Sequence, residues 1–218
     1  VTYDDNFIYI AAEMYDPNGT IIQTLKRDVD FWSGDNIVIV LDPVNQKSNG
    51  YMFGVNPYGV QMEGLLTGNT GSRGSRPGSG AMNDDWDNKW FVAVQNESDK
   101  WTIEMAIPFK TLRFKTDLDT WGINFIRLDP GINETHVWAP VPRQFNLFDL
   151  GYLGALNWDQ TPKKVGKNIS LIPYARVAND KTPASTDTDF AVGADAKVAL
   201  SPTLNLDLTY NPDFSQVE

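Results

Sequence analysis

The 218-residue sequence contains no cysteine and a single histidine, His136. The missing cysteines exclude disulfide bonds, thiolate metal ligands and cysteine nucleophiles, and they suit the cytosol and a bacterial envelope equally well. No G-x-S-x-G sequence accompanies the one histidine, so a Ser-His-Asp triad has little support. Catalytic classes that depend on these residue types are therefore disfavoured.

Basic residues and long apolar segments are also scarce. The chain has 18 Lys and Arg against 28 Asp and Glu, giving a formal net charge of −10, and no basic run concentrates positive charge. Such a surface repels phosphate backbones, so we expect no nucleic-acid partner. No apolar run approaches the ~18 residues of a transmembrane helix, although a transmembrane β-strand needs only about 9–11 alternating residues.

What the sequence does contain is short runs rich in Val, Ile, Tyr, Phe and Trp, separated by Asp, Asn, Gly and Pro. Helical periodicity is almost absent, so these runs predict an all-β fold. The first run is apolar on both faces, which is typical of a central strand in an antiparallel β-sandwich. The expected strands are Asn6–Met14, Asn36–Asp42, Tyr51–Tyr58, Val60–Leu66, Phe91–Gln95, Trp101–Ile107, Trp121–Leu128 and Glu134–Trp138.

Two further regions differ from this pattern. Thr67–Ala81 is rich in Gly and Ser, which predicts a mobile loop or a lid that orders on binding. From Asn168 onward, Asn168–Val177, Phe190–Leu200 and Leu204–Tyr210 alternate strictly between apolar and polar residues. The strands of a membrane barrel show this pattern, and so do half-buried strands of a soluble sheet, so alternation alone leaves both open.

Several sequence blocks occur in one order and carry a family resemblance. They are Asp4-Asp5 with Phe7-Ile8-Tyr9, Gly34-Asp35 before Val40-Leu41-Asp42, Phe53 to Gln61, Trp86-Asp87 with Trp90, Trp101 to Phe109 with Leu112-Arg113, Trp121 to Phe125 with Arg127, and Asn211 to Glu218. Together they resemble the family 9 carbohydrate-binding module-like domain at the front of bacterial outer-membrane proteins whose remainder is an uncharacterised β-barrel. The resemblance implies a sandwich over residues 1–167 and the first barrel strands over 168–218. We accordingly expect the chain to be part of a longer protein.

The resemblance also implies a sugar site. Family 9 modules hold a terminal sugar between two tryptophans, and sugar recognition in general uses aromatic faces together with planar polar side chains. The positions that match these parts are Trp86, Trp90 and Trp138 for stacking, and Asn56, Gln61, Glu63 and Arg127 for hydroxyl groups. Each tryptophan has the alternative of a core position, which we expect for Trp101 and Trp121.

Metal and catalytic sites receive less support. Related modules carry structural calcium, and Asp84, Asp85 and Asp87 are oxygen ligands of the right type, but their spacing is not that of an EF-hand and a solvated turn is the alternative. A glycosidase needs two carboxylates ~5–9.5 Å apart, and no acidic pair here stands in a distinctive setting. We expect no catalytic residues, and any association with a glycoside hydrolase is implied by resemblance only.

The resemblance implies non-catalytic glycan binding at a Gram-negative envelope, in the service of carbohydrate catabolism. The protein would then lie in the outer membrane, with the sandwich in the periplasm or on the surface. A second hypothesis is a structural or interaction domain, acting as a plug or as a docking surface for an envelope protein partner. It is motivated by Phe53 and Gly54, which stand where sugar binders tend to carry a polar or basic residue, and by the loop expected at Thr67–Ala81.

Overall fold

The computed structural model describes residues 1–16, 19, 21, 25, 31–67, 82–83, 86–163, 169–181, 186–201 and 204–211. The chain divides into two compact units, Val1–Val165 and Gly166–Glu218. The boundary expected from the sequence, after residue 167, lies close to this division. Most of the Gly- and Ser-rich stretch Thr67–Ala81 falls outside the described residues, so its predicted mobility stays a prediction.

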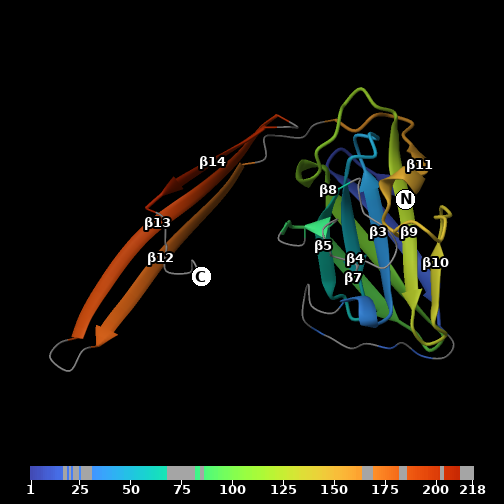
Figure 1. The fold of residues 1–218 in the computed structure, drawn as a ribbon, viewed down its shortest axis with the longest axis horizontal. Coiled ribbons are helices and arrows are strands. Elements are labelled where there is room, and N and C mark those ends of the chain that lie inside the picture. Colours follow the sequence, from blue (N-terminus) through green and yellow to red (C-terminus); the bar gives the residue numbers. More distant parts are fainter. Residues whose placement is uncertain are drawn as a thin grey trace. The chain divides into compact units, whose positions relative to one another are not determined.

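The first unit contains two antiparallel sheets (Figure 1). The smaller sheet consists, in spatial order, of β1 (Thr2–Tyr3), β2 (Phe7–Tyr15), β8 (Lys100–Pro108) and β7 (Phe91–Asn96). The larger sheet consists of β10 (Glu134–Val137), β9 (Thr120–Asp129), β3 (Asn36–Asp42), β4 (Asn49–Val55), β5 (Gln61–Thr67) and β6 (Met82–Asn83), with β11 (Gly154–Asn157) also paired to β9. The predicted all-β, antiparallel sandwich is thereby confirmed.

Helical structure in the described residues is limited to three single turns of 3₁₀-helix. These are η1 (Phe31–Ser33), η2 (Phe109–Thr111) and η3 (Leu150–Tyr152). None of the helical segments described is long and apolar enough to span a lipid bilayer.

The main core lies between the two sheets. Because side chains alternate along a strand, Ile103, Met105 and Ile107 of β8 all point inward, as do Ile37 and Ile39 of β3. Trp101 and Trp121 are fully buried in the same cluster, which confirms the core position expected for both. This interior fixes the register of both sheets and thus the positions of the loops at their ends.

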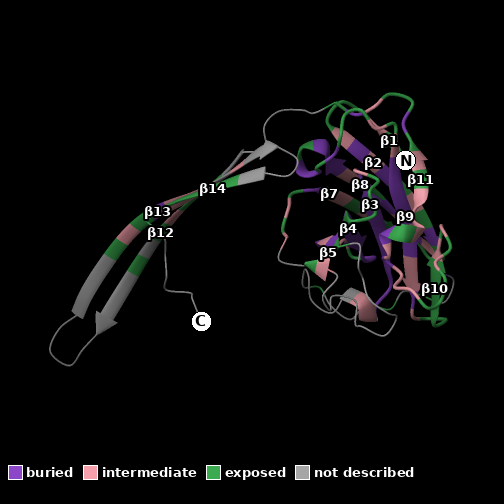
Figure 2. Cartoon of the chain, turned by 45° about the horizontal axis from the view of Figure 1, so that its top comes forward, coloured by how far each residue is buried: buried purple, intermediate pink, exposed green. Residues whose placement is uncertain are grey.

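The outer face of the larger sheet carries a second apolar cluster. Every residue of β3 is buried, so β3 needs cover on both sides, and its outward residues Val38 and Val40 belong to this cluster. The cover comes from the segment 139–153, whose Phe148 and Leu150 are buried there, with Trp32 packed alongside. In Figure 2 the strands under this cover are mostly buried while β10 is exposed. The long connection after β10 is therefore a structural layer.

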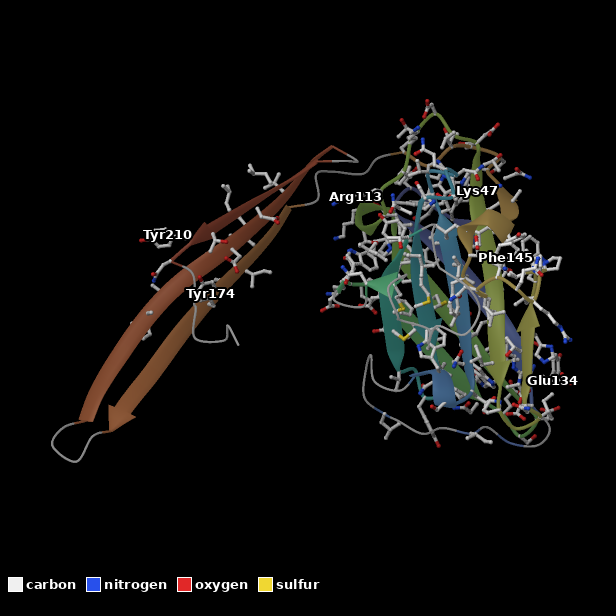
Figure 3. The ribbon with its side chains drawn as sticks, in the orientation of Figure 1. Lys47, Arg113, Glu134, Phe145, Tyr174 and Tyr210 are labelled. Carbon is white, nitrogen blue, oxygen red and sulfur yellow. The ribbon has the colours of Figure 1, made fainter. Side chains whose placement is uncertain are left out.

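The second unit is a three-stranded antiparallel sheet of β12 (Ile169–Lys181), β13 (Thr186–Ser201) and β14 (Leu204–Tyr210). The three strands predicted there are present. Val177 pairs with Phe190 and Ala196 with Leu208, so one face is apolar, and its large side chains are exposed. On the other face the ring of Tyr174 lies against Gly193 (Figure 3). The described strands form an open sheet, and their likeness to the start of a barrel stays a prediction.

Candidate functional site

Two of the predicted sugar contacts, Trp90 and Glu63, are paired with each other inside the sandwich. The Trp90 side chain is 4% exposed, and its Nε1–H donates to Glu63 Oε2 at 3.0 Å. Glu63 Oε1 accepts the backbone N–H of Asn88 at 3.3 Å. The Trp90 ring meets Phe53 edge-on at 5.4 Å, so both of these candidates stabilise the fold in the structure.

Trp86 and Gln61 lie beside this pair. Gln61 Nε2 donates to the backbone oxygen of Trp90 at 3.3 Å. Trp86 is half-buried, with its ring centroid 5.2 Å from Tyr51 and 6.0 Å from Phe53. Four candidates lie near this edge of the larger sheet, and among them only Trp86 has an aromatic ring that is partly exposed to solvent.

Asn56 shapes the turn between β4 and β5. It is buried, and its Oδ1 accepts the backbone N–H groups of Tyr58 and Val60, both at 3.0 Å. Gly59 completes the turn with a φ of +76°, a conformation that glycine adopts without strain. The turn leaves Tyr58 at its tip with an exposed ring.

Arg127 lies in a cluster of buried acids at one end of the sandwich. Its Nη1 donates to the backbone oxygen of Tyr15 at 2.7 Å, and its Nη2 lies 3.0 Å from Asp129 Oδ2. Burial raises the pKa of the nearby Asp35 carboxyl, and the negative charges of Asp16 and Asp129 raise it further. The guanidinium therefore compensates buried negative charge rather than facing solvent.

Trp138 is placed differently from the other candidates, because the residue is 58% exposed. Its backbone N–H donates to the Phe125 oxygen at 2.9 Å, and its ring meets the Phe125 ring edge-on at 5.9 Å. On one side the ring lies on Gly154, where an added Cβ would come within 2.2 Å of Trp138 Cζ3. Glycine at this position thus provides the space that lets the ring lie there.

Further aromatic residues come from the segment that follows Trp138. Phe145 and Tyr152 lie 4.8 Å apart, on the side of the unit formed by β10 and β11 (Figure 3). Phe148 packs 5.0 Å from Trp32. Sequence reasoning missed Phe145, Phe148 and Tyr152 because residues 143–164 show no strand or helix periodicity. The density of aromatic residues after Trp138 was the signal available.

Most of the predicted calcium ligands fall outside the described residues. Asp84 and Asp85 lie outside the described residues, and Asp87 is exposed. Across the described ranges, no group of three or more carboxylate or histidine side chains is arranged to hold a metal ion. Because two of the three expected ligands are not among the described residues, calcium binding stays a prediction.

The predicted residues thus divide into an internal and an external group. Trp90, Glu63, Asn56 and Arg127 make internal hydrogen bonds or ion pairs, and Gln61 bonds to the backbone. Trp138 offers an exposed aromatic face, and Trp86 a partial one. The structure brings Trp86, Trp90, Gln61 and Glu63 together around β5, while Trp138 follows β10 at the opposite edge of the larger sheet. An exposed indole face is suited to stacking on an apolar ring surface.

Two family models match the chain, one within each of its two units. A family model described as carbohydrate family 9 binding domain-like matches residues 1–138, and one described as a domain of unknown function (DUF5916) matches residues 167–218. A family 9 module from Caldicellulosiruptor kristjanssonii, solved with cellotriose, is 16% identical with a TM-score of 0.49, over 72% of each chain. A structure of such a module with glucose, from the same organism, is 15% identical with a TM-score of 0.44, over 75% of this chain and 76% of that one. No curated protein matched the sequence.

Proposed function

The chain belongs to the carbohydrate family 9 binding domain-like family, and we propose that its first unit binds a glycan without catalysing a reaction on it. The observation that carries the proposal is the exposed ring of Trp138, held between Phe125 and Gly154. The apolar face of a sugar ring stacks on such a surface. Because neighbouring groups already fix the indole, little side-chain entropy is lost on binding.

Calorimetric titration of the whole chain with neutral mono- and oligosaccharides, in the presence of Ca²⁺, tests the proposal. Loss of a central aromatic contact typically costs more than ~1.4 kcal/mol, so Trp138→Ala should weaken binding at least about tenfold. Phe91→Ala is the matched control, because Phe91 is a comparably exposed aromatic residue on the other sheet. Absence of heat with the unsubstituted chain, or equal losses for both variants, would contradict glycan binding at Trp138.

We propose further that the protein acts in carbohydrate catabolism in the outer membrane of a Gram-negative bacterium, with β12–β14 as the beginning of a membrane wall. The exposed apolar face of this sheet supports the proposal, since Leu171, Val177, Phe190 and Leu208 would face lipid. Membrane fractionation followed by carbonate extraction tests it. Recovery of the protein in the soluble fraction would refute the membrane setting and leave glycan binding untouched.

A structural or interaction domain for an envelope partner is the second candidate function. The bond between Trp90 and Glu63 favours it, because two side chains expected to hold sugar are engaged with each other. Under this alternative, Trp138→Ala would leave every carbohydrate titration unchanged. The same variant would instead weaken capture of an envelope protein by the immobilised chain.

A further inference from the structure

Two polar side chains of β10 lie on the same face of the larger sheet as the exposed Trp138. Trp138 directly follows β10, and its backbone N–H donates to the Phe125 oxygen on β9, so the pairing of the two strands continues to this residue. In the same register, His136 lies opposite Arg127. Residues two apart on a strand face the same side. Glu134, His136 and Trp138 therefore form one row, called here the β10 row.

The residues between the members of the row point to the other face. Val137 packs against the apolar cluster that the segment 139–153 covers, and Thr135 shares its side of the strand by alternation. β10 is the last strand of the larger sheet, and within the described residues no strand pairs with its far side. The β10 row is therefore on an open edge, which is exposed in Figure 2.

The two polar members of the row are paired with each other and remain open to solvent. His136 Nε2 lies 3.4 Å from Glu134 Oε2, and the two side chains are 52% and 58% exposed. In the part of the chain that the structure describes, this contact is the one polar interaction that either side chain makes, so His136 Nδ1 and Glu134 Oε1 are open to a ligand. An imidazole and a carboxylate supply both a donor and acceptors, which is what neighbouring sugar hydroxyl groups require. Glu134 is labelled on β10 in Figure 3.

The spacing of the row suits a chain of sugar residues. A strand rises about 3.3 Å per residue, so His136 lies about 7 Å along β10 from Trp138, a separation comparable to the length of one sugar residue. A sugar ring on the indole therefore brings the hydroxyl groups of the next residue to His136 and Glu134. The row also offers no excess positive charge to an acidic sugar, because Arg127 is already paired with Asp129 at 3.0 Å.

We propose that the first unit binds a neutral oligosaccharide along β10, with one sugar residue on Trp138 and the hydroxyl groups of the next on His136 and Glu134. The inference rests on the proposed function, because it extends the Trp138 site by a second sugar position. It makes His136 and Glu134 determinants of chain length, since a monosaccharide on Trp138 does not reach them whereas a disaccharide does.

The test is a calorimetric comparison of matched sugars of two lengths, with the whole chain. The ligands are glucose, xylose and mannose, together with the β-1,4-linked disaccharide of each. For at least one of the three sugars, we expect the disaccharide to bind about tenfold more tightly than the monosaccharide, because its second residue adds hydrogen bonds to both polar side chains of the row.

Substitutions separate the two sugar positions. His136→Ala and Glu134→Ala should each weaken disaccharide binding about three- to fivefold and leave monosaccharide binding unchanged, whereas Trp138→Ala should weaken both. Glu134→Gln removes the charge but keeps an acceptor oxygen, so it should retain most of the gain from the second sugar residue. Thr135→Ala is the matched control, because Thr135 is an exposed residue of the same strand on its other face, and it should change neither affinity. Since all three residues of β10 are exposed, these variants should fold as the unsubstituted chain does.

Equal affinities for monosaccharide and disaccharide in all three series would overturn the inference and leave glycan binding at Trp138 standing. So would a His136→Ala variant that binds the disaccharide as tightly as the unsubstituted chain, or one that loses monosaccharide binding to the same extent, since His136 would then act only through Trp138. A loss in Thr135→Ala equal to that in His136→Ala would also overturn it. Absence of heat with every one of these sugars contradicts the proposed function itself, and this inference with it.

Discussion

Trp90 and Trp138 belong to the same sandwich and were both expected to stack on a sugar, yet their surroundings are opposite. Trp90 is 4% exposed and its indole N–H is bonded to Glu63, whereas Trp138 is 58% exposed and lies on a glycine. Each lies immediately beside a strand, Trp90 before β7 and Trp138 after β10. The difference comes from the residue that the neighbouring strand places beside each ring. Glu63 of β5 faces inward and accepts the Trp90 N–H, so Trp90 is part of the core, whereas β11 places only Gly154 beside Trp138.

The largest expected effect tests the burial of Trp90. Trp90→Ala removes a ring from the core and should lower the free energy of unfolding by about 3–5 kcal/mol. Trp138→Ala should lower it far less, by about 1 kcal/mol, because more than half of Trp138 is already exposed to water. Urea denaturation of both variants measures the contrast, and similar midpoints would show that the two rings contribute alike.

The second-largest expected effect on the free energy of unfolding comes from Glu63, the buried hydrogen-bond acceptor of Trp90. Glu63→Leu leaves the Trp90 N–H without its buried acceptor and should cost about 1–3 kcal/mol of unfolding free energy. Glu63→Gln retains a carbonyl oxygen as acceptor and should cost less. If Leu at this position stabilised the chain, the hydrogen bond would not account for the burial of Trp90.

Trp86 should fall between the two extremes. Its ring is half-buried against Tyr51 and Phe53, so Trp86→Ala should cost about 1–2 kcal/mol of unfolding free energy. A sugar titration of the same variant shows whether the open part of the ring also contacts ligand. An unfolding free energy equal to that of the unsubstituted chain would mark Trp86 as a surface residue like Trp138.

The smallest expected effect on stability concerns Gly154, the residue on which the exposed Trp138 ring lies. Gly154→Ala places a Cβ against the Trp138 ring and should displace it, so that glycan affinity falls about as far as in Trp138→Ala. The free energy of unfolding should change by less than about 1 kcal/mol, since alanine is otherwise favoured over glycine in a strand. Gly131→Ala is the control, because the nearest atom to its added Cβ lies at 3.4 Å. If Gly154→Ala bound sugar as tightly as the unsubstituted chain, glycan binding would not depend on the position of the Trp138 ring.

Most of the sandwich could be predicted from sequence because its central strands combine alternation with clear turn signals. The hairpin expected from Asn36–Asp42 and Tyr51–Tyr58 is the β3–β4 pair, with Leu41 opposite Tyr51. The hairpin of Trp121–Leu128 with Glu134–Trp138 is likewise present as β9 and β10. These pairings are local in sequence, so periodicity and turns suffice to specify them.

The short strands and the environment of the candidate site could not be predicted. β11 has four residues and pairs with β9, more than 20 residues earlier in the chain, and no local pattern indicates that pairing. The partner of Trp90 is 27 residues away on β5, so its burial depends on packing that no sequence window contains. Trp138 depends in the same way on Gly154, whose importance comes only from the ring that lies on it.

The outer edge of β9 is covered in two pieces, by β10 along Ile126–Asp129 and by β11 along Thr120–Ile123. Between them, Asn124 exchanges two hydrogen bonds with the backbone of Ala139, and Trp138 donates to Phe125. This stretch closes the remaining backbone groups against pairing with another chain, which is how native sheets avoid edge-to-edge aggregation. The residues that present the exposed indole therefore also close this part of the β9 edge, so substitutions that alter ligand preference at this loop must keep those backbone hydrogen bonds.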